Sequence, residues 1–308
     1  RYKALLKTAK YASRGEFNKR VLDLLVNFLG DKDNNARSIS AWTIAKYGQN
    51  KLFTEKAINP LLKMLRKEED KDTFTNVTMA LAVYTEGNHV SDKDIDKSRL
   101  LKLLDSENEK VRANAALLFG HLANRNFVAK EVFEKIVSLL DDNDLSVRRN
   151  ASYAVLSYAE KDMLDANIME KLIEGLQDWE GVKINNILTL GIYAEKGFTD
   201  ERALEKLVKL LKDRNKDVKE NAAETLIKYA NKNLTDERVL ETCVKLLKDK
   251  NVEIRKAAAR LLALYAKKNI VNLNAVKPLR KAVEDETIAQ DAKLTLKRYK
   301  EAGIIDKE

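Results

Sequence analysis

The amino-acid sequence predicts an all-α protein of stacked helical hairpins, a right-handed α-solenoid of about eight repeats plus an N-terminal half repeat. Three observations lead to this prediction. The 308 residues include only two prolines and ten glycines, whereas a β-sandwich or barrel needs many more turn residues. Similar segments recur at a nearly constant period, which is typical of stacked supersecondary units. Within each segment, apolar residues recur at the spacing of one helix face.

Five segments of the chain align with one another at a period close to 36 residues. They begin at Leu104, Leu140, Leu176, Leu211 and Leu247, and a weaker copy begins at Leu29. We therefore expect one repeat domain over residues 1–308. Its units are predicted as a half repeat at 1–15 and repeats at about 16–51, 52–88, 89–126, 127–162, 163–197, 198–233, 234–269 and 270–303.

Each complete unit is predicted to hold two antiparallel helices joined by a short polar turn. We number the second helix from offset 0, and its apolar stripe continues at offsets 4, 8 and 11, as in Val147, Ala151, Val155 and Tyr158. Offset 0 falls at Ala36, Thr73, Val111, Val147, Val182, Val218, Ile254 and Ile288. The small residue at offset 4 lets helices approach closely, and a larger one would cost roughly 1–3 kcal/mol through overpacking.

The first residues of the chain fit the second helix of a half repeat. Tyr11 and Ala12 match the Tyr-Ala pair found at offsets 11 and 12 of later units, which places Arg1 at offset 1. We therefore expect that the sequence starts inside a repeat and that the full protein extends further.

An aspartate and a basic residue six positions later recur in four of the predicted turns. The pairs are Asp31 and Arg37, Asp142 and Arg148, Asp213 and Lys219, and Asp249 and Arg255. The aspartate lies in the turn, where it is expected to cap the second helix. In a stack of repeats, these acids and cations are also expected to form a structural ladder between neighbouring units.

A turn aspartate followed by Val and a basic residue resembles the consensus of the HEAT repeat family. The resemblance to this HEAT/armadillo-like class covers nearly the whole chain. In such proteins the second helices line a concave groove, so the resemblance implies a groove here as well. The side chains at offsets 3, 6 and 10, beside the core stripe, are expected to face it.

The groove candidates follow from these three offsets. They are Trp42, Asn114, Leu117, His121, Asn150, Tyr153, Asn185, Leu188, Asn221 and Arg260. The four asparagines share offset 3, and their amides suit either a bound peptide backbone or a structural ladder between helices. The armadillo asparagine ladder lies near offset 10 instead, where this chain has His121. The large residues at offset 6 are either exposed for a partner or buried between repeats.

No motif for catalysis, a cofactor or a metal is visible in the sequence. The chain has two histidines and one cysteine, which form no zinc-binding cluster, and no phosphate-binding glycine loop is present. We therefore predict a protein that is not an enzyme and holds no cofactor or metal. The lone Cys243 lies in an apolar helical run and is expected to be buried. One thiol and no long apolar stretch indicate an intracellular, cytoplasmic protein without a membrane span.

The most favoured function is a scaffold or adaptor that binds a partner protein or peptide in the groove. Nucleic-acid binding is the alternative, because residues 1–53 and 200–308 each have a net charge of +7, which suits binding to phosphate groups. Residues 54–199, which lie between them in the sequence, have a net charge of −5. Some DNA glycosylases of HEAT-like fold use an acid and aromatic residues in their groove, but Glu224 is the only acid at these offsets and no aromatic shares its unit. A cofactor-attaching lyase of HEAT-like fold is a third hypothesis, although nothing here places a nucleophile beside a base.

Overall fold

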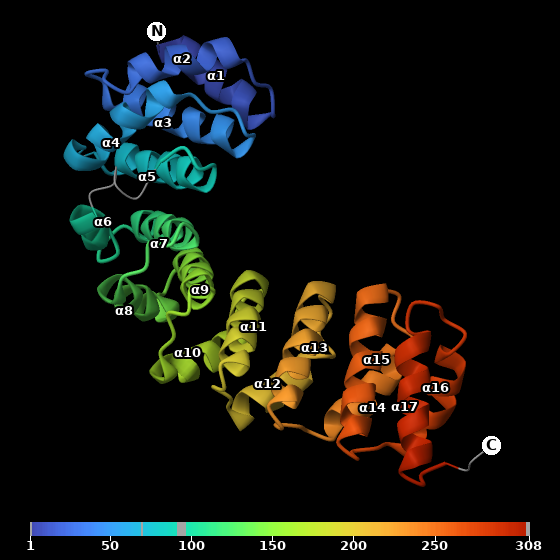
Figure 1. The fold of residues 1–308 in the computed structure, drawn as a ribbon. Coiled ribbons are helices and arrows are strands. Elements are labelled where there is room, and N and C mark those ends of the chain that lie inside the picture. Colours follow the sequence, from blue (N-terminus) through green and yellow to red (C-terminus); the bar gives the residue numbers. More distant parts are fainter. Residues whose placement is uncertain (1, 69, 91–96, 306–308) are drawn as a thin grey trace. The chain divides into compact units, whose positions relative to one another are not determined.

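The computed structural model describes residues 2–68, 70–90 and 97–305. These residues form α-helices and short 3-10 turns, and no strand occurs in the described ranges. The all-α prediction is therefore confirmed (Figure 1). The chain divides into two compact units, Arg1–Met163 and Leu164–Glu308, and each is an α-solenoid described here by itself. The single repeat domain expected over 1–308 stays a prediction.

The first unit begins with the half repeat α1 (Tyr2–Ser13) and continues as helix pairs. The pairs are α2 (Lys19–Phe28) with α3 (Asn34–Gln49), α4 (Ile58–Lys67) with α5 (Lys71–Glu86), α6 (Lys97–Leu103) with α7 (Glu109–Asn124), and α8 (Lys130–Ser138) with α9 (Leu145–Ala159). The 3-10 turns η1 (Glu55–Ala57) and η2 (Leu139–Asp141) adjoin α4 and α8. In this unit, α3, α5, α7 and α9 each pack against their own first helix and against the second helix that precedes them.

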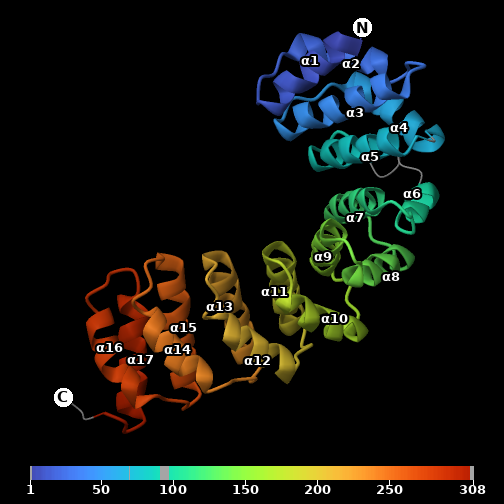
Figure 2. The ribbon, with the colours of Figure 1, turned by 180° about the vertical axis from the view of Figure 1, so that it is seen from behind.

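The second unit repeats the same arrangement. Its pairs are α10 (Met169–Glu174) with α11 (Glu180–Glu195), α12 (Glu201–Leu210) with α13 (Lys216–Asn231), α14 (Arg238–Leu246) with α15 (Val252–Lys267), and α16 (Val276–Ala282) with α17 (Ala289–Glu301). The 3-10 turns η3 (Ala166–Ile168), η4 (Gly175–Gln177) and η5 (Leu273–Ala275) adjoin these helices. The second helices α11, α13, α15 and α17 lie side by side in both views (Figure 2).

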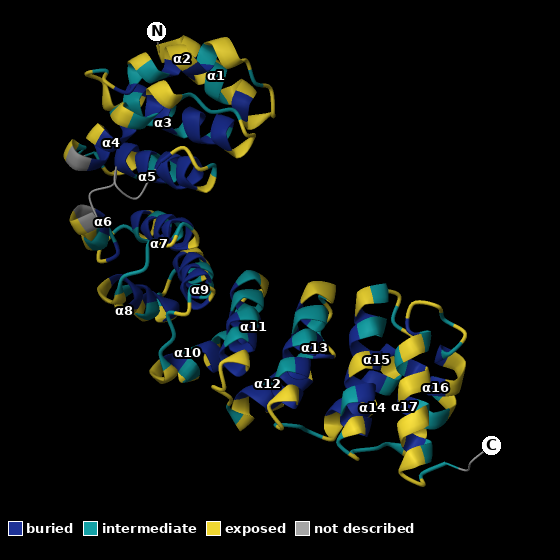
Figure 3. Cartoon of the chain, in the orientation of Figure 1, coloured by how far each residue is buried: buried dark blue, intermediate teal, exposed yellow. Residues whose placement is uncertain are grey.

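The core of each unit lies where the apolar stripe of a second helix meets its neighbours. Val218, Ala222, Leu226 and Tyr229, at offsets 0, 4, 8 and 11 of α13, are all completely buried. Figure 3 shows buried residues where helices face one another and exposed residues on their outer sides. Because each stripe is covered only by adjacent helices, stacking supplies the burial that no single hairpin achieves alone.

The turns between the paired helices are capped differently from our expectation. In α9 the N-cap residue is Asp144, whose Oδ1 accepts hydrogen bonds from the backbone N–H groups of Ser146 and Val147. The expected cap, Asp142, lies two residues earlier, and its Oδ1 accepts from the N–H of Asp144 at 2.9 Å. The reason is positional, because only the residue directly before the first helical turn can reach the N–H groups of that turn.

Every second helix ends at the same offset with a residue in the left-handed conformation. These offset-15 residues are Gly15, Lys51, Asn88, Asn126, Asp162, Gly197, Asn233, Asn269 and Gly303. The N–H of the following residue then bonds the carbonyl at offset 11, as from Ile270 to Tyr265 at 3.0 Å. This closure satisfies a terminal carbonyl group and turns the chain toward the next first helix.

A tyrosine at offset 11 joins the two helices of most repeats. Tyr47, Tyr84, Tyr158, Tyr193, Tyr229, Tyr265 and Tyr299 are all at most 2% exposed. In five of them the hydroxyl oxygen accepts from the backbone N–H just before the first helix, as from Asp236 to Tyr265 at 3.0 Å. The hydroxyls of Tyr158 and Tyr229 face the N–H groups of Ala129 and Asp200 without the geometry of a hydrogen bond.

Candidate binding surface of the second helices

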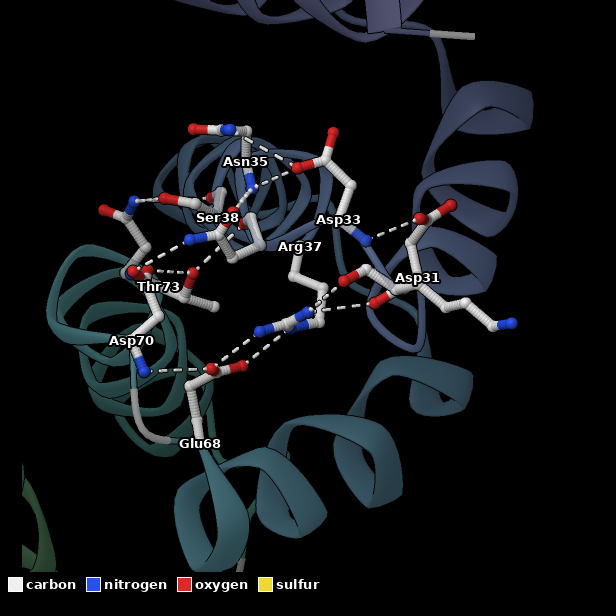
Figure 4. Close-up of polar contacts among 11 residues, drawn as sticks. Asp31, Asp33, Asn35, Arg37, Ser38, Glu68, Asp70 and Thr73 are labelled. Carbon is white, nitrogen blue, oxygen red and sulfur yellow. Dashed lines mark hydrogen bonds and ion pairs between the residues drawn. The ribbon is translucent and has the colours of Figure 1, made fainter.

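The turn acids and offset-1 cations connect neighbouring repeats, and we call them the turn ladder. Figure 4 shows the first step, in which Nη1 of Arg37 donates to the carbonyl oxygens of Asp31 at 3.0 Å and Lys32 at 3.1 Å. The Nε and Nη2 atoms of Arg37 donate to the Glu68 carboxylate of the next repeat at 2.7 and 2.8 Å. The cation therefore closes its own turn and pairs with the acid of the following repeat.

The same arrangement recurs along both units. The ion pairs, at 2.8 to 3.0 Å, are Arg112 with Asp142, Lys183 with Asp213, Lys219 with Asp249, and Arg255 with Asp285. Arg148 and Arg255 also donate to the carbonyl oxygens of the turn aspartates six residues earlier, Asp142 and Asp249, at 2.8 and 3.0 Å. In three of the four predicted sequence pairs, the cation thus bonds the backbone carbonyl of its aspartate, as Arg37 does with Asp31. The carboxylates of Asp142, Asp213 and Asp249 pair with the cation of the preceding repeat.

One step of the turn ladder in the first unit uses apolar and neutral residues instead. Phe74 occupies offset 1 of α5, and Ser106 occupies the turn position that an acid holds elsewhere. Both residues line a cavity of about 280 Å³ between α5 and the turn before α7. Since cation and acid are replaced together, this junction leaves no buried charge without its partner.

The asparagines at offset 3 connect adjacent second helices in the first unit. Asn114 Nδ2 donates to the Thr75 carbonyl at 3.1 Å, and Asn150 Nδ2 donates to the Ala113 carbonyl at 2.9 Å. Asn76 Nδ2 makes the equivalent bond to the Ser38 carbonyl at 3.3 Å. The acceptor is always at offset 2 of the preceding helix. The amide groups of these asparagines therefore bind the protein's own backbone, which favours the structural-ladder alternative over peptide binding.

Large side chains at offset 6 form a strip across the first unit, which we call the apolar row. It consists of Trp42 on α3, Met79 on α5, Leu117 on α7 and Tyr153 on α9, each half-buried. Neighbouring members lie on helices that pack side by side. Sequence reasoning missed Met79 because repeat 52–88 retains little of the consensus, although its offset alone identifies the position.

A polar cluster adjoins the apolar row at Tyr153. The Tyr153 hydroxyl lies 3.1 Å from Nδ1 of His121 and accepts from Nδ2 of Asn124 at 2.9 Å. The Tyr153 ring packs over Gly120, where a Cβ atom would approach Cε1 to 2.8 Å. Burial lowers the pKa of His121, so its ring is neutral at pH 7. This cluster fixes the orientation of the Tyr153 ring.

The second unit carries the remaining predicted residues. Leu188 and Asn185 on α11 and Asn221 on α13 are half-buried. Unlike Asn150, Asn221 donates to a carbonyl of its own helix, that of Asp217, at 2.7 Å. Arg260 on α15 is exposed and pairs with Glu224 at 2.9 Å. The structure therefore brings His121 to Tyr153 and Arg260 to Glu224, and it places the asparagines in two different roles.

Within the described ranges, no cluster of three His, Cys, Asp or Glu side chains has the geometry of a metal site. Likewise, no helix in that part of the chain is both long and apolar enough to cross a membrane. Cys243 is fully buried, as expected, and burial raises the pKa of its thiol, which keeps the thiol protonated and unreactive.

Comparison with known proteins identifies the family of the chain. The family model of the adaptin N-terminal region matches residues 97–295, well over half of the chain. The chain belongs to this family. No curated protein sequence matches it. Among solved structures, the designed armadillo repeat protein YIII(Dq)4CqI has a TM-score of 0.54 at 23% identity, over 67% of this chain and 99% of that chain.

A second solved structure shows the same fold. It is the designed armadillo repeat protein YIII(Dq.V1)4CPAF in complex with the peptide (KR)4, with a TM-score of 0.54 at 23% identity. The match covers 68% of this chain and 99% of that chain. Together with the family match, these similarities confirm the HEAT/armadillo-like repeat architecture that the turn residues predicted.

Proposed function

We propose that this protein is a non-enzymatic scaffold or adaptor that binds a partner protein or peptide along the surface of its second helices. The family resemblance implies that this surface is concave. The apolar row carries the proposal, because four large side chains at one offset form a strip on adjacent helices that remains partly exposed. Aromatic and apolar side chains of this kind contribute most of the binding free energy at protein interfaces.

The charge beside Tyr153, at one end of the apolar row, supports a basic partner segment there, whereas Lys46 Nζ lies 5.5 Å from the centre of the Trp42 ring at the other end. Glu86, the last residue of α5, and Glu160, the C-cap residue that follows α9, are both exposed at offset 13. The pKa of Tyr153 is raised mainly by burial and, to a smaller extent, by the negative charge of these two glutamates. A peptide with apolar anchors and flanking Lys or Arg residues would complement this arrangement. The peptide bound by the designed armadillo protein above is also basic.

The basic groove residues of the second unit give less support to nucleic-acid binding. Lys228 pairs with Glu195 at 3.0 Å, Lys256 with Glu253 at 2.9 Å, and Arg260 with Glu224 at 2.9 Å. A phosphate group would have to compete with these carboxylates and would gain less from releasing counterions. Protein binding is therefore the function that the geometry favours.

The experiment compares capture of partners by the wild-type chain and by two matched variants. Leu117→Arg places a charge in the apolar row, and Leu24→Arg makes the same change at a 59% exposed leucine of the first helix α2. Each chain is immobilised, exposed to nuclease-treated native lysate, and its bound proteins are identified by mass spectrometry. Circular dichroism and thermal melting establish that both variants are folded.

We expect a defined set of proteins that wild type and Leu24→Arg retain and that Leu117→Arg loses. Two results would contradict the proposal. One is equal capture by all three chains, which would place the partner away from the apolar row. The other is recovery of nucleic acid alone when the nuclease step is omitted, with no protein specific to the wild-type surface.

A further inference from the structure

The turn before α11 departs from the pattern of the other repeats at one exposed residue. In six other second helices the N-cap residue is Asp or Asn, and its side chain accepts a hydrogen bond from the first turn of the helix. In α11 this position holds Trp179, whose side chain makes no such bond. Trp179 is 69% exposed, and no large apolar residue in the described ranges is more exposed. A departure of this kind from local stability rules is typical of functional sites.

Hydrogen bonds of the backbone hold Trp179 in place. Its N–H donates to Oδ1 of Asp178 at 2.6 Å, and its carbonyl oxygen accepts from the N–H of Lys183 at 2.9 Å. The turn is also one residue shorter than the turns of the next two repeats. A large side chain on a short turn that is already ordered loses little conformational freedom on binding, which suits an anchor residue.

The turn ladder places this turn beside those of the next two repeats. Lys183 Nζ pairs with Asp213 Oδ2 at 3.0 Å, and Lys219 Nζ pairs with Asp249 Oδ2 at 2.8 Å. The other carboxylate oxygen of each aspartate, Oδ1, accepts a backbone N–H of its own turn at 2.9 Å. Both carboxylates are therefore used inside the protein and offer little negative charge to a partner.

The cations around these two aspartates are exposed and unpaired. They are Lys212, Arg214, Lys216, Lys248 and Lys250. In the part of the second unit that the structure describes, none of the five forms an ion pair with a carboxylate. The cations on the second-helix surface differ, because Lys228, Lys256 and Arg260 are all paired. We call Trp179 and the five unpaired cations the basic turn edge.

The charge pattern of the basic turn edge favours an acidic protein segment over nucleic acid. Two exposed acids, Glu180 and Asp217, lie on the same turns, while Glu253 pairs with Lys256 at 2.9 Å. A nucleic-acid strand is charged at every phosphate and would meet both free acids, whereas a peptide can place its few carboxylates at the cations alone. Tryptophan and arginine are also enriched at the hot spots of protein interfaces.

We propose that the basic turn edge binds an acidic segment of a partner protein. An aromatic or apolar residue of this segment packs on Trp179, and its carboxylates pair with the cations. The basic turn edge lies on the turns of the second unit, whereas the apolar row lies on second helices of the first unit, so this proposal does not rest on the apolar row. Because the two surfaces favour segments of opposite charge, one chain can bind two different partners.

Defined peptides test the proposal directly. The probe is a fluorescently labelled, end-blocked peptide with one phenylalanine between two runs of glutamate, titrated with the whole chain at low salt and followed by anisotropy. Two matched peptides have glutamine in place of glutamate, or alanine in place of phenylalanine. We expect saturable binding of the probe that weakens as salt is added, and weaker binding of both matched peptides.

The variant Trp179→Asn separates loss of binding from loss of folding. Asparagine is the N-cap residue of α13 and α15, so this variant should regain the missing cap and melt at a higher temperature than wild type. It should nevertheless bind the probe at least about tenfold more weakly. Leu273→Asn is the control, because Leu273 is 66% exposed at the start of η5, away from these turns, and it should bind like wild type.

Charge reversal gives a second test. Arg214→Glu combined with Lys250→Glu should weaken binding of the probe at least about tenfold. Lys277→Glu combined with Lys281→Glu makes the same change in net charge on the first helix α16 and should stay within about threefold of wild type.

Three results would overturn the proposal. The first is absence of saturable binding, or equal binding of the probe and the glutamine peptide. The second is equal binding of the probe by wild type and Trp179→Asn. The third is tighter binding of a labelled oligothymidylate that the same variants lose, because it would identify nucleic acid as the occupant.

Discussion

The guanidinium group of Arg112 makes a two-point ion pair with the carboxylate of Asp142 in the next repeat. Nε lies 2.8 Å from Oδ2, and Nη2 lies 2.9 Å from Oδ1. The third nitrogen, Nη1, donates to the carbonyl oxygens of Ser106 and Glu107 in the turn before α7. One side chain therefore fixes the conformation of its own turn and the distance to the next one.

Removing this cation is expected to destabilise the first unit. The two side chains are only 18% and 10% exposed, so Arg112→Ala leaves a mostly buried carboxylate without its partner. We expect a loss of about 1–3 kcal/mol in the free energy of unfolding, measured by urea denaturation. Lys130→Ala breaks the exposed pair with Glu134, at 83% and 59% exposure, and should change stability by less than about 0.5 kcal/mol. Equal losses in the two variants would contradict this role.

The turn ladder also predicts how stability depends on pH. Burial raises the pKa of Asp142, but hydrogen bonds from Arg112 and from the N–H of Asp144 outweigh it, so the net pKa lies below the ordinary value of 3.8. The same holds for Asp213 and Asp249. A carboxyl group with a lowered folded pKa stabilises the protein above its unfolded pKa, and this contribution is lost as the pH falls through the folded pKa.

Wild type should therefore lose stability as the pH falls below about 4, in the window set by these lowered pKa values. Asp142→Asn should be less stable at pH 6 and should lose less on acidification, because one titrating group is absent. Urea denaturation at pH 6 and pH 3 measures both quantities. An acid-induced loss in Asp142→Asn as large as in wild type would show that this carboxylate does not contribute.

The offset-11 tyrosines provide a matched pair of substitutions. Tyr265→Phe deprives the Asp236 N–H of the hydroxyl that accepts it at 3.0 Å, and should cost about 1–2 kcal/mol. The Tyr229 hydroxyl is buried without a hydrogen bond of standard geometry, so Tyr229→Phe should be neutral or slightly stabilising. Both rings are completely buried, so packing is the same in the two tests. Thermal unfolding separates them, and a reversed order would contradict the proposed hydrogen bond.

The helix ends predict a stabilising substitution at Lys51. Its φ of 61° is the left-handed conformation that eight other second helices reach with Gly, Asn or Asp. Because a lysine Cβ is strained there, Lys51→Gly should raise the free energy of unfolding by about 0.5–1 kcal/mol. The opposite change, Gly197→Lys at the same offset with φ of 92°, should lower it. An unchanged or lower stability in Lys51→Gly would argue against backbone strain at this site.

The repeat period and the apolar stripe were sufficient to predict the helices, because the 3.6-residue spacing of apolar side chains is visible in the local sequence. Val218 and Tyr229 illustrate this, since both were placed in the core by offset and both are fully buried. The pairing of Arg37 with Glu68 was not predicted, because a pair 31 residues apart depends on how far each repeat is displaced along the stack.

The binding surface was predicted less completely. The asparagines at offset 3 were recognised as a series from their spacing, but whether an asparagine bonds a partner or the preceding helix depends on the spacing of α7 and α9, which no local pattern encodes. Met79 escaped notice for another reason, since its repeat has Glu68 in place of the turn aspartate and Phe74 in place of the cation that marked the others.

The most direct test of the proposed function is a hydrogen-exchange footprint of the captured partner on the full chain. We predict slower exchange in peptides from α7 and α9, which carry Leu117 and Tyr153, and no change in peptides from the first helices α2 and α8. Protection confined to the first helices, with α7 and α9 unchanged, would contradict the claim that the second helices form the binding surface.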